Sequence, residues 1–179
     1  MPEITTRLAS VAAALAAVLL LSGCGYSLAG RGSFLPAHIR TVGIPLFSNL
    51  SSVPDVDRIL TERVRNEFIS RGRYRVLADR TGADAVLVGD VTSITFAPAA
   101  FTAQQQASRY ALVVTARIEF TDVKENKVLW QNPAIQFREE FEVTTTTDAS
   151  AFLGQNADAL QRVATEFARA IVSAILEAF

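Results

Sequence analysis

The alternation of apolar and polar residues from Tyr110 to Val123 constrains the fold more than any other feature of the sequence. Every second residue between Leu112 and Phe120 is apolar, and most of the residues between them are polar. A period of two residues is typical of a β-strand with one face buried. A polar turn at 124–127 leads into a second strand, Val128 to Val143, so the two strands are predicted to form a hairpin.

A long amphipathic helix is predicted to cover this sheet. It runs from about Ser150 to Glu177, and its apolar side chains fall within about a third of the helix circumference. These are Leu153, Ala157, Leu160, Val163, Ala164, Phe167, Ile171, Ala174 and Ile175. A second helix is predicted over residues 54–71, with a less regular apolar stripe that ends at Gly72.

Further strands are predicted at 39–47, 74–77 and 83–96, where Pro98 is expected to end the last one because proline cannot donate a ladder hydrogen bond. A polar loop is expected at 101–108, and Pro133 predicts a bend or an edge position in the returning strand. The expected fold is therefore α+β: a two-layer sandwich with a mixed sheet of about four strands and two helices on one face.

The first residues are predicted to be a secretory signal peptide. The apolar run from Leu8 to Leu21 is shorter than the roughly 20 residues that span a membrane. Arg7 precedes the run, and the small residues Ser22 and Gly23 follow it, which is the order found in signal peptides. Residues 1–23 are therefore expected to be removed.

Cys24, the only cysteine, follows directly. A single cysteine cannot form an internal disulfide, so it is a reactive thiol, a ligand, a buried residue or a point of modification. The segment Leu21-Ser22-Gly23-Cys24 resembles the lipobox of bacterial lipoproteins. That resemblance implies cleavage before Cys24, a diacylglycerol on its sulfur, and an acyl chain such as palmitate on its new amino group. The alternative is an ordinary signal peptide followed by a chance cysteine.

Several acyl chains hold a protein on a membrane durably, whereas a single chain holds it reversibly. Gly25 follows the cysteine in place of the aspartate that resembles an inner-membrane retention signal. The expected location is therefore the outer membrane, with the anchor on the side that faces the periplasm.

The composition argues against several classes of protein. The formal net charge is −1, whereas a nucleic-acid-binding domain carries a basic excess. The chain has one histidine, His38, and one cysteine, which argues against a metal site made by protein side chains alone. His38 is expected on the surface, and the scattered Asp84, Asp90 and Asp122 do not suggest a catalytic pair. The expectation is a protein that is not an enzyme and has no cofactor beyond the acyl groups on Cys24.

Four segments together are similar to the LptE family of lipopolysaccharide-assembly lipoproteins. They are Gly23-Cys24-Gly25-Tyr26, then Val42 to Asn49 before a helix that begins at Pro54-Asp55, then Ala83 to Val91, and Val128-Leu129-Trp130 in the hairpin. The resemblance covers essentially the whole mature chain, which divides into a lipidated tether at 24–38 and a single LptE-like α/β domain at 39–179. The start departs from the family pattern, with Ser27 and Ala29 where a histidine and an arginine are common.

The resemblance implies a non-enzymatic plug inside the LptD β-barrel of the outer membrane. Such a protein assists the insertion of lipopolysaccharide into the outer leaflet and binds lipopolysaccharide itself. The implied partners are an LptD-type barrel, lipopolysaccharide, and the membrane through the anchor. The alternatives are another periplasmic lipoprotein of similar fold, either a curli-secretion-like pore component or an activator of peptidoglycan synthesis. An enzyme or a small-ligand carrier is disfavoured because no nucleophile–base pair is evident.

Contact with lipid A phosphates would need basic side chains, since arginine makes paired hydrogen bonds to phosphate and lysine acts as a point charge. Arg117 on the polar face of the long strand, with Lys124 and Lys127 at the turn, is the candidate group, and Arg109 is a possible addition. The alternative is a solvated strand face. The polar residues of that face suit either the polar lumen of a barrel or plain water: Arg117, Glu119, Thr121, Arg138, Glu140 and Glu142.

Overall fold

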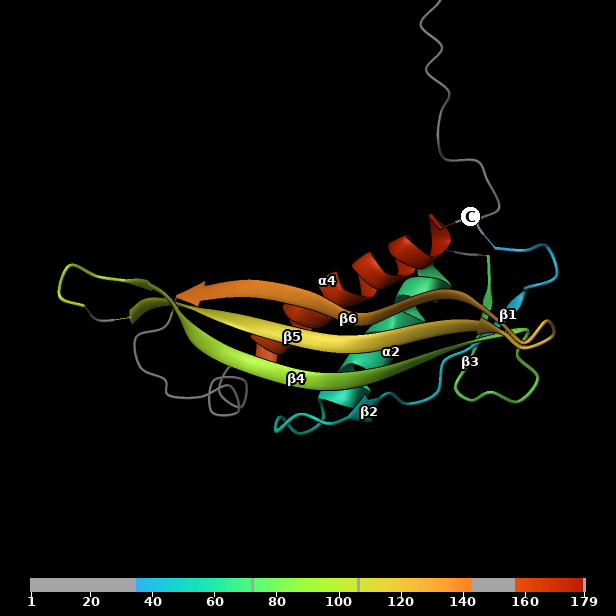
Figure 1. The fold of residues 1–179 in the computed structure, drawn as a ribbon, viewed down its shortest axis with the longest axis horizontal. Helices are drawn as coiled ribbons and strands as arrows, with labels where there is room; N and C mark the ends of the chain where they lie inside the picture. The colour runs from blue at the N-terminus through green and yellow to red at the C-terminus, as the bar shows by residue number, and fades with distance from the viewer. Residues whose placement is uncertain (1–34, 72, 106, 143–156, 179) are drawn as a thin grey trace, which may run out of the picture. The chain divides into compact units, whose positions relative to one another are not determined.

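The computed structural model describes residues 35–71, 73–105, 107–142 and 157–178. These residues form six strands and two helices (Figure 1). In chain order they are β1 (Thr41–Gly43), β2 (Ser48–Asn49), α2 (Val56–Ser70), β3 (Arg75–Leu77), β4 (Ala85–Phe101), β5 (Ala107–Asp122), β6 (Lys127–Glu142) and α4 (Ala157–Leu176).

The strands form one mixed sheet in the order β3-β1-β4-β5-β6, and β2 also pairs with β4. Strand β1 is parallel to β3 and β4, whereas β4, β5 and β6 are antiparallel. The expected α+β fold with a mixed sheet is confirmed, but the sheet has six strands and not about four. Part of the difference is β2 (Ser48–Asn49), a short strand that follows the strand predicted at 39–47.

The break between β1 and β2 has a local cause. Pro45 has no N–H to donate to a ladder, and the carbonyl of Ile44 accepts two hydrogen bonds from the Arg65 guanidinium, at 2.9 and 2.6 Å. The Ile44 carbonyl is thus satisfied outside the sheet, whereas the Ile44 N–H still donates to the carbonyl of Leu77 in β3 at 2.9 Å. The chain rejoins β4 at Ser48, which pairs with Asp90.

Both helices cover the same face of the sheet (Figure 1). Phe68 of α2 lies against Phe120 of β5, with ring centroids 6.4 Å apart. Phe167 of α4 meets Phe137 of β6 at 4.9 Å. Phe137 pairs with Val114, and Val114 shares a strand face with Phe120, because alternate residues of a strand point the same way. The helices therefore bury the apolar face that the sequence alternation predicted.

That alternation is confirmed residue by residue. The apolar side chains that were predicted to share one face of the long strand are all completely buried: Leu112, Val114, Ala116, Ile118 and Phe120. Strand β5 therefore provides the central apolar row of the core.

The expectation that Pro98 ends a strand is wrong, because β4 continues to Phe101 and β5 begins at Ala107. The polar loop is therefore shorter than expected. The pairing register shifts between Pro98 and Ala100, and an irregular register is one of the few settings in which a sheet accommodates proline. The two strands run past the helices as a long hairpin (Figure 1).

Pro133 lies in β6, which is the last strand in the sheet order, so the predicted edge position is confirmed. The register of β6 shifts between the residues paired with Ala116 and Ile118, next to this proline. The predicted strand end at Val143 and the first turn of the last helix, from Ser150, lie outside the described residues.

Candidate functional site

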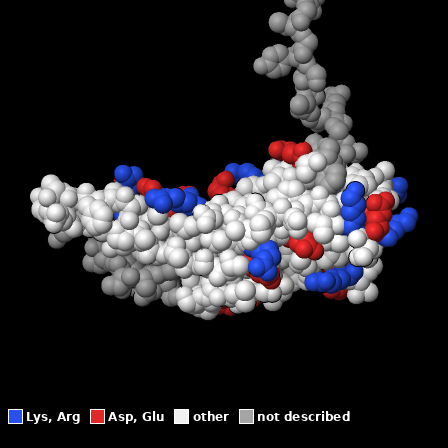
Figure 2. Space-filling view, viewed as in Figure 1, with Lys and Arg blue, Asp and Glu red and all other residues white. Residues whose placement is uncertain are grey.

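The candidate site is the face of the sheet opposite the helices, which we call the open face. Within the described residues, no helix packs on it. Arg117 on β5 is opposite Asp90 on β4, and on β6 Arg138 is opposite Val113 and Glu140 is opposite Ala111. Paired residues share a face, so these charged side chains all stand on the open face. Figure 2 shows charged side chains gathered in separate groups along the domain and an uncharged end where the β4–β5 hairpin lies.

Arg117 forms an ion pair at the middle of the open face. Its Nη1 lies 3.6 Å from Oδ2 of Asp90, and its side chain is 61% exposed. An exposed pair at this distance contributes at most about 1 kcal/mol to stability. The guanidinium therefore keeps donors available for another anion.

A second group on the open face contains two arginines and one carboxylate. Glu140 accepts from Arg138 at 3.0 Å and pairs with Arg109 at 3.4 Å. Both arginine side chains are more than half exposed, and the exposed Glu142 stands opposite Arg109 on the same face, so the group presents both charges to its surroundings. Arg109 was predicted only as an addition to the Arg117 group. The register between β5 and β6 places it near Arg138 instead.

The predicted contact residues lie in separate places. Lys124 and Lys127 are exposed at the β5–β6 turn. Arg117 lies five residues before the end of β5, which is roughly 16 Å along a strand. The structure therefore brings the two lysines together at the turn and leaves Arg117 with Asp90. Their contact with lipopolysaccharide stays a prediction.

His38 fastens the segment before β1 to the β5–β6 turn. Its side chain is 28% exposed, and its Nε2 lies 2.6 Å from Oδ2 of Asp122, whose side chain is fully buried. The expected surface position of His38 is therefore only partly correct. The other carboxylate oxygen, Oδ1, accepts from the backbone N–H groups of Lys124 at 2.8 Å and Glu125 at 3.0 Å.

The electrostatics of this end of the domain favour ionised carboxylates. Burial raises the pKa of Asp122, but hydrogen bonds from the Glu125 and Lys124 N–H groups and from His38 outweigh burial and hold the pKa below its usual value. The backbone N–H groups of Arg40 and Thr41 donate to Asp84 and lower its pKa as well. The ionised carboxylates of Asp84 and Asp122 thus hydrogen-bond to residues 38–41 and fasten this segment to the sheet.

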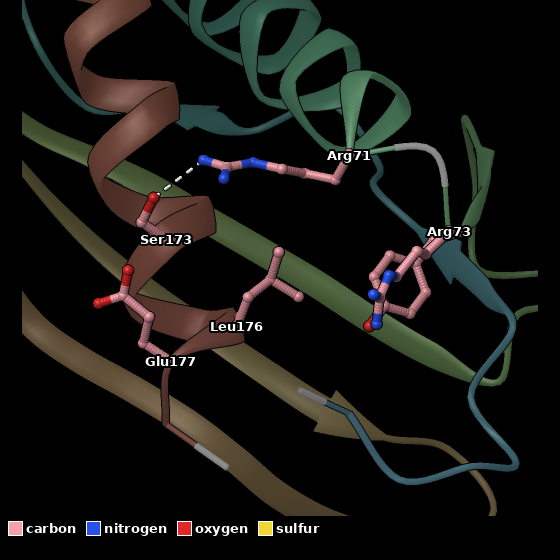
Figure 3. A pocket seen from close by; sticks show the side chains of 6 residues that line it. Arg71, Arg73, Ser173, Leu176 and Glu177 are labelled. Carbon is pink, nitrogen blue, oxygen red and sulfur yellow. Dashed lines mark hydrogen bonds between the residues drawn. The ribbon is translucent and has the colours of Figure 1, made fainter. Parts of the chain in front are cut away.

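A small pocket lies between the carboxyl ends of α2 and α4 (Figure 3). Arg71 donates to Oγ of Ser173 at 2.9 Å and also pairs with Glu67 at 2.8 Å. Burial raises the pKa of Tyr74. The pocket is lined by Arg71, Arg73, Tyr74, Ser173, Leu176 and Glu177. The contact from Arg71 to Ser173 therefore joins the ends of the two helices.

The predicted lipid attachment point, Cys24, lies outside the described residues. None of the helices in the described ranges combines the length and the apolar character that a membrane span requires. The anchor therefore rests on the sequence.

A family model for lipopolysaccharide assembly, LptE, matches residues 39–175. This chain belongs to the LptE family. The match covers the sheet and both helices, so the resemblance seen in the sequence is confirmed. LptE membership makes the chain a lipopolysaccharide-assembly protein.

Several solved structures are similar to this chain at low sequence identity. The PelC dodecamer from Paraburkholderia phytofirmans is 18% identical with a TM-score of 0.50, over 77% of this chain and 89% of that chain. A hypothetical protein from Chlamydia trachomatis is 10% identical with a TM-score of 0.53, over 77% and 96%. Rare lipoprotein B from Shewanella oneidensis is 17% identical with a TM-score of 0.49, over 72% and 92%. A search of curated protein sequences found no match.

Proposed function

We propose that this LptE-family protein is a non-enzymatic outer-membrane lipoprotein that plugs an LptD-type β-barrel and assists the insertion of lipopolysaccharide into the outer leaflet. Its signal peptide, residues 1–23, is removed, and acyl chains on Cys24 hold it on the periplasmic side. The observation that carries the proposal is the charged open face of the sheet, on which no described helix packs, in a member of this family.

The chemistry of the open face suits the inside of a barrel. Outer-membrane barrels have polar interiors, so a plug must present donors and acceptors to the barrel wall. Arg117 with Asp90, and Arg138 with Glu140, present both in neighbouring positions. The helices cover the apolar face of the sheet. Among the described residues, the polar open face is therefore the face that a partner can contact.

Affinity purification from the native cell envelope tests the barrel partnership. After cross-linking, we expect a large β-barrel protein to be recovered in a one-to-one ratio with this protein. Because PelC shares the fold and forms a dodecamer, self-association into rings is the alternative that the same sample tests. Recovery of homo-oligomeric rings, or of a peptidoglycan synthase, without a barrel would contradict the proposal.

Removing basic charge should weaken binding to lipopolysaccharide. Charge-assisted hydrogen bonds contribute about 1.5–3 kcal/mol, so changing Arg117, Lys124 and Lys127 together to glutamine should lower affinity by roughly tenfold or more. The measurement is binding of purified protein to lipopolysaccharide micelles at fixed salt. Arg169→Gln is the matched control, because Arg169 is also exposed and ion-paired but stands on α4, away from the open face. Equal affinity of the triple variant and the control would show that the three basic residues are only solvated.

A further inference from the structure

Three potential metal ligands meet at the end of the domain where the chain enters the sheet. One oxygen or nitrogen atom from each of His38, Asp122 and Glu125 lies within 4.8 Å of the other two. His38 and Asp122 are 84 residues apart in the chain. No ligand spacing was therefore visible in the sequence, and the folded sheet creates the group.

The buried negative charge of Asp122, at the end of the domain where the chain enters the sheet, would be stabilised by a bound cation. The Asp122 carboxylate is fully buried, and an ionised carboxylate that is withdrawn from water needs a positive partner or a metal ion. The side chain nearest to this carboxylate is His38, whose Nε2 lies 2.6 Å from it, and imidazole nitrogen is a common metal ligand. Asp84 also acts electrostatically on His38, and Glu125 adds a further carboxylate, while Arg40 and Lys124 are the neighbouring cations.

The ligand atoms fit a first-row transition metal better than calcium or magnesium. Histidine nitrogen with two carboxylates is a donor set that suits zinc, whereas calcium and magnesium take oxygen ligands alone. Bonds of about 2.0–2.1 Å in a tetrahedral site separate ligand atoms by roughly 3.3 Å. At present Nε2 of His38 and Oδ2 of Asp122 are 2.6 Å apart and no pair among the three atoms is more than 4.8 Å apart. Side-chain rotations would bring them to the separation of a metal site, with the metal taking the place of the proton between Nε2 of His38 and Oδ2 of Asp122.

The surroundings of the three residues complete the site. The Asp122 carboxylate is oriented by backbone N–H groups of Lys124 and Glu125 on its other oxygen, which is the kind of outer support that metal-binding carboxylates have. Glu125 is exposed and His38 is partly exposed, so water can fill the fourth position. We propose that His38, Asp122 and Glu125 bind a divalent transition metal ion, of which zinc fits best.

Bound metal would fasten the segment before β1 to the β5–β6 turn and stabilise the domain by mass action. The test uses the mature lipoprotein in detergent, without a histidine tag, stripped with EDTA and dialysed. Calorimetric titration with Zn²⁺ should show one ion bound per chain. At a hundredfold excess over the dissociation constant, the unfolding temperature should rise by roughly 5–10 °C.

Two ligand variants and one control make the test specific. Glu125→Gln should weaken Zn²⁺ binding by roughly tenfold or more with an unchanged metal-free unfolding temperature, because the exposed side chain is altered while its backbone N–H still bonds to Asp122. His38→Gln should abolish the 1:1 binding, and Glu62→Gln on α2, which changes a carboxylate 54% exposed, should bind like the wild type. Absence of binding at millimolar Zn²⁺, equal affinity of Glu125→Gln and Glu62→Gln, or equally tight binding of Mg²⁺ would overturn the proposal.

Discussion

Replacing Cys24 with alanine should move the protein from the membrane fraction to the soluble periplasmic fraction. Each buried methylene of an acyl chain contributes about 0.8 kcal/mol to membrane binding, so losing several chains removes durable attachment. Cys24 is the only cysteine, and no other residue can take the thioether-linked lipid. The fold should be unaffected, because Cys24 precedes the described domain. Cell fractionation followed by immunoblotting measures the effect.

Mass spectrometry of the wild-type amino-terminal peptide gives an independent check on the anchor. We expect a chain that begins at Cys24, with a diacylglycerol on sulfur and an acyl group on nitrogen. Ser27→Ala is the control variant, since it changes the tether downstream of the cysteine and should stay in the membrane fraction. An unmodified thiol at position 24, or a full-length product in the cytosol, would contradict the lipoprotein assignment.

Replacing Phe120 with alanine should cost about 3–5 kcal/mol of the free energy of unfolding. The side chain is completely buried in the middle of the sheet and packs on Phe68, so its removal loses buried apolar surface and leaves a cavity. Because total stabilities are usually about 5–15 kcal/mol, the variant should lose a large part of its stability. Urea denaturation followed by circular dichroism measures the change.

The matched control is the same substitution at Phe101. This side chain is 63% exposed at the tip of the β4–β5 hairpin, and exposed positions of this kind usually change stability by less than about 0.5 kcal/mol. A loss at Phe101 equal to that at Phe120 would show that the hairpin end, and not the layer between sheet and helices, supplies the core.

The core substitution also bears on function, because one strand serves both faces. Phe120 points to the helices, while Arg117 and Glu119 on the same strand point to the open face. A loss of packing at Phe120 should therefore displace the charged side chains without altering them. Stability must be measured before any loss of lipopolysaccharide binding is assigned to the open face.

Local patterns predicted the long elements and failed at the short ones. The row from Leu112 to Phe120 and the amphipathic stripe of α4 are long enough to specify which side is buried. Residues 39–47 were predicted as one strand, but the chain leaves the sheet at Ile44. The Arg65 side chain from α2 donates two hydrogen bonds to the Ile44 carbonyl, which therefore does not bond to a neighbouring strand. Proline rules were correct for Pro133 at an edge and wrong for Pro98, where a register shift accommodates the ring.

The sequence by itself determined four features: the lipobox resemblance around Cys24, the buried face of β5, the amphipathic last helix and the family. Each of these depends on patterns among residues that are close together in the chain. Only the tertiary structure decided that Arg117 pairs with Asp90, that Glu140 joins Arg109 to Arg138, and that His38 meets Asp122 and Glu125. Arg138 and Glu140 are neighbours on one strand, and Asp122 and Glu125 lie at one turn. The other contacts depend on strand order and register, which join residues that no local period relates.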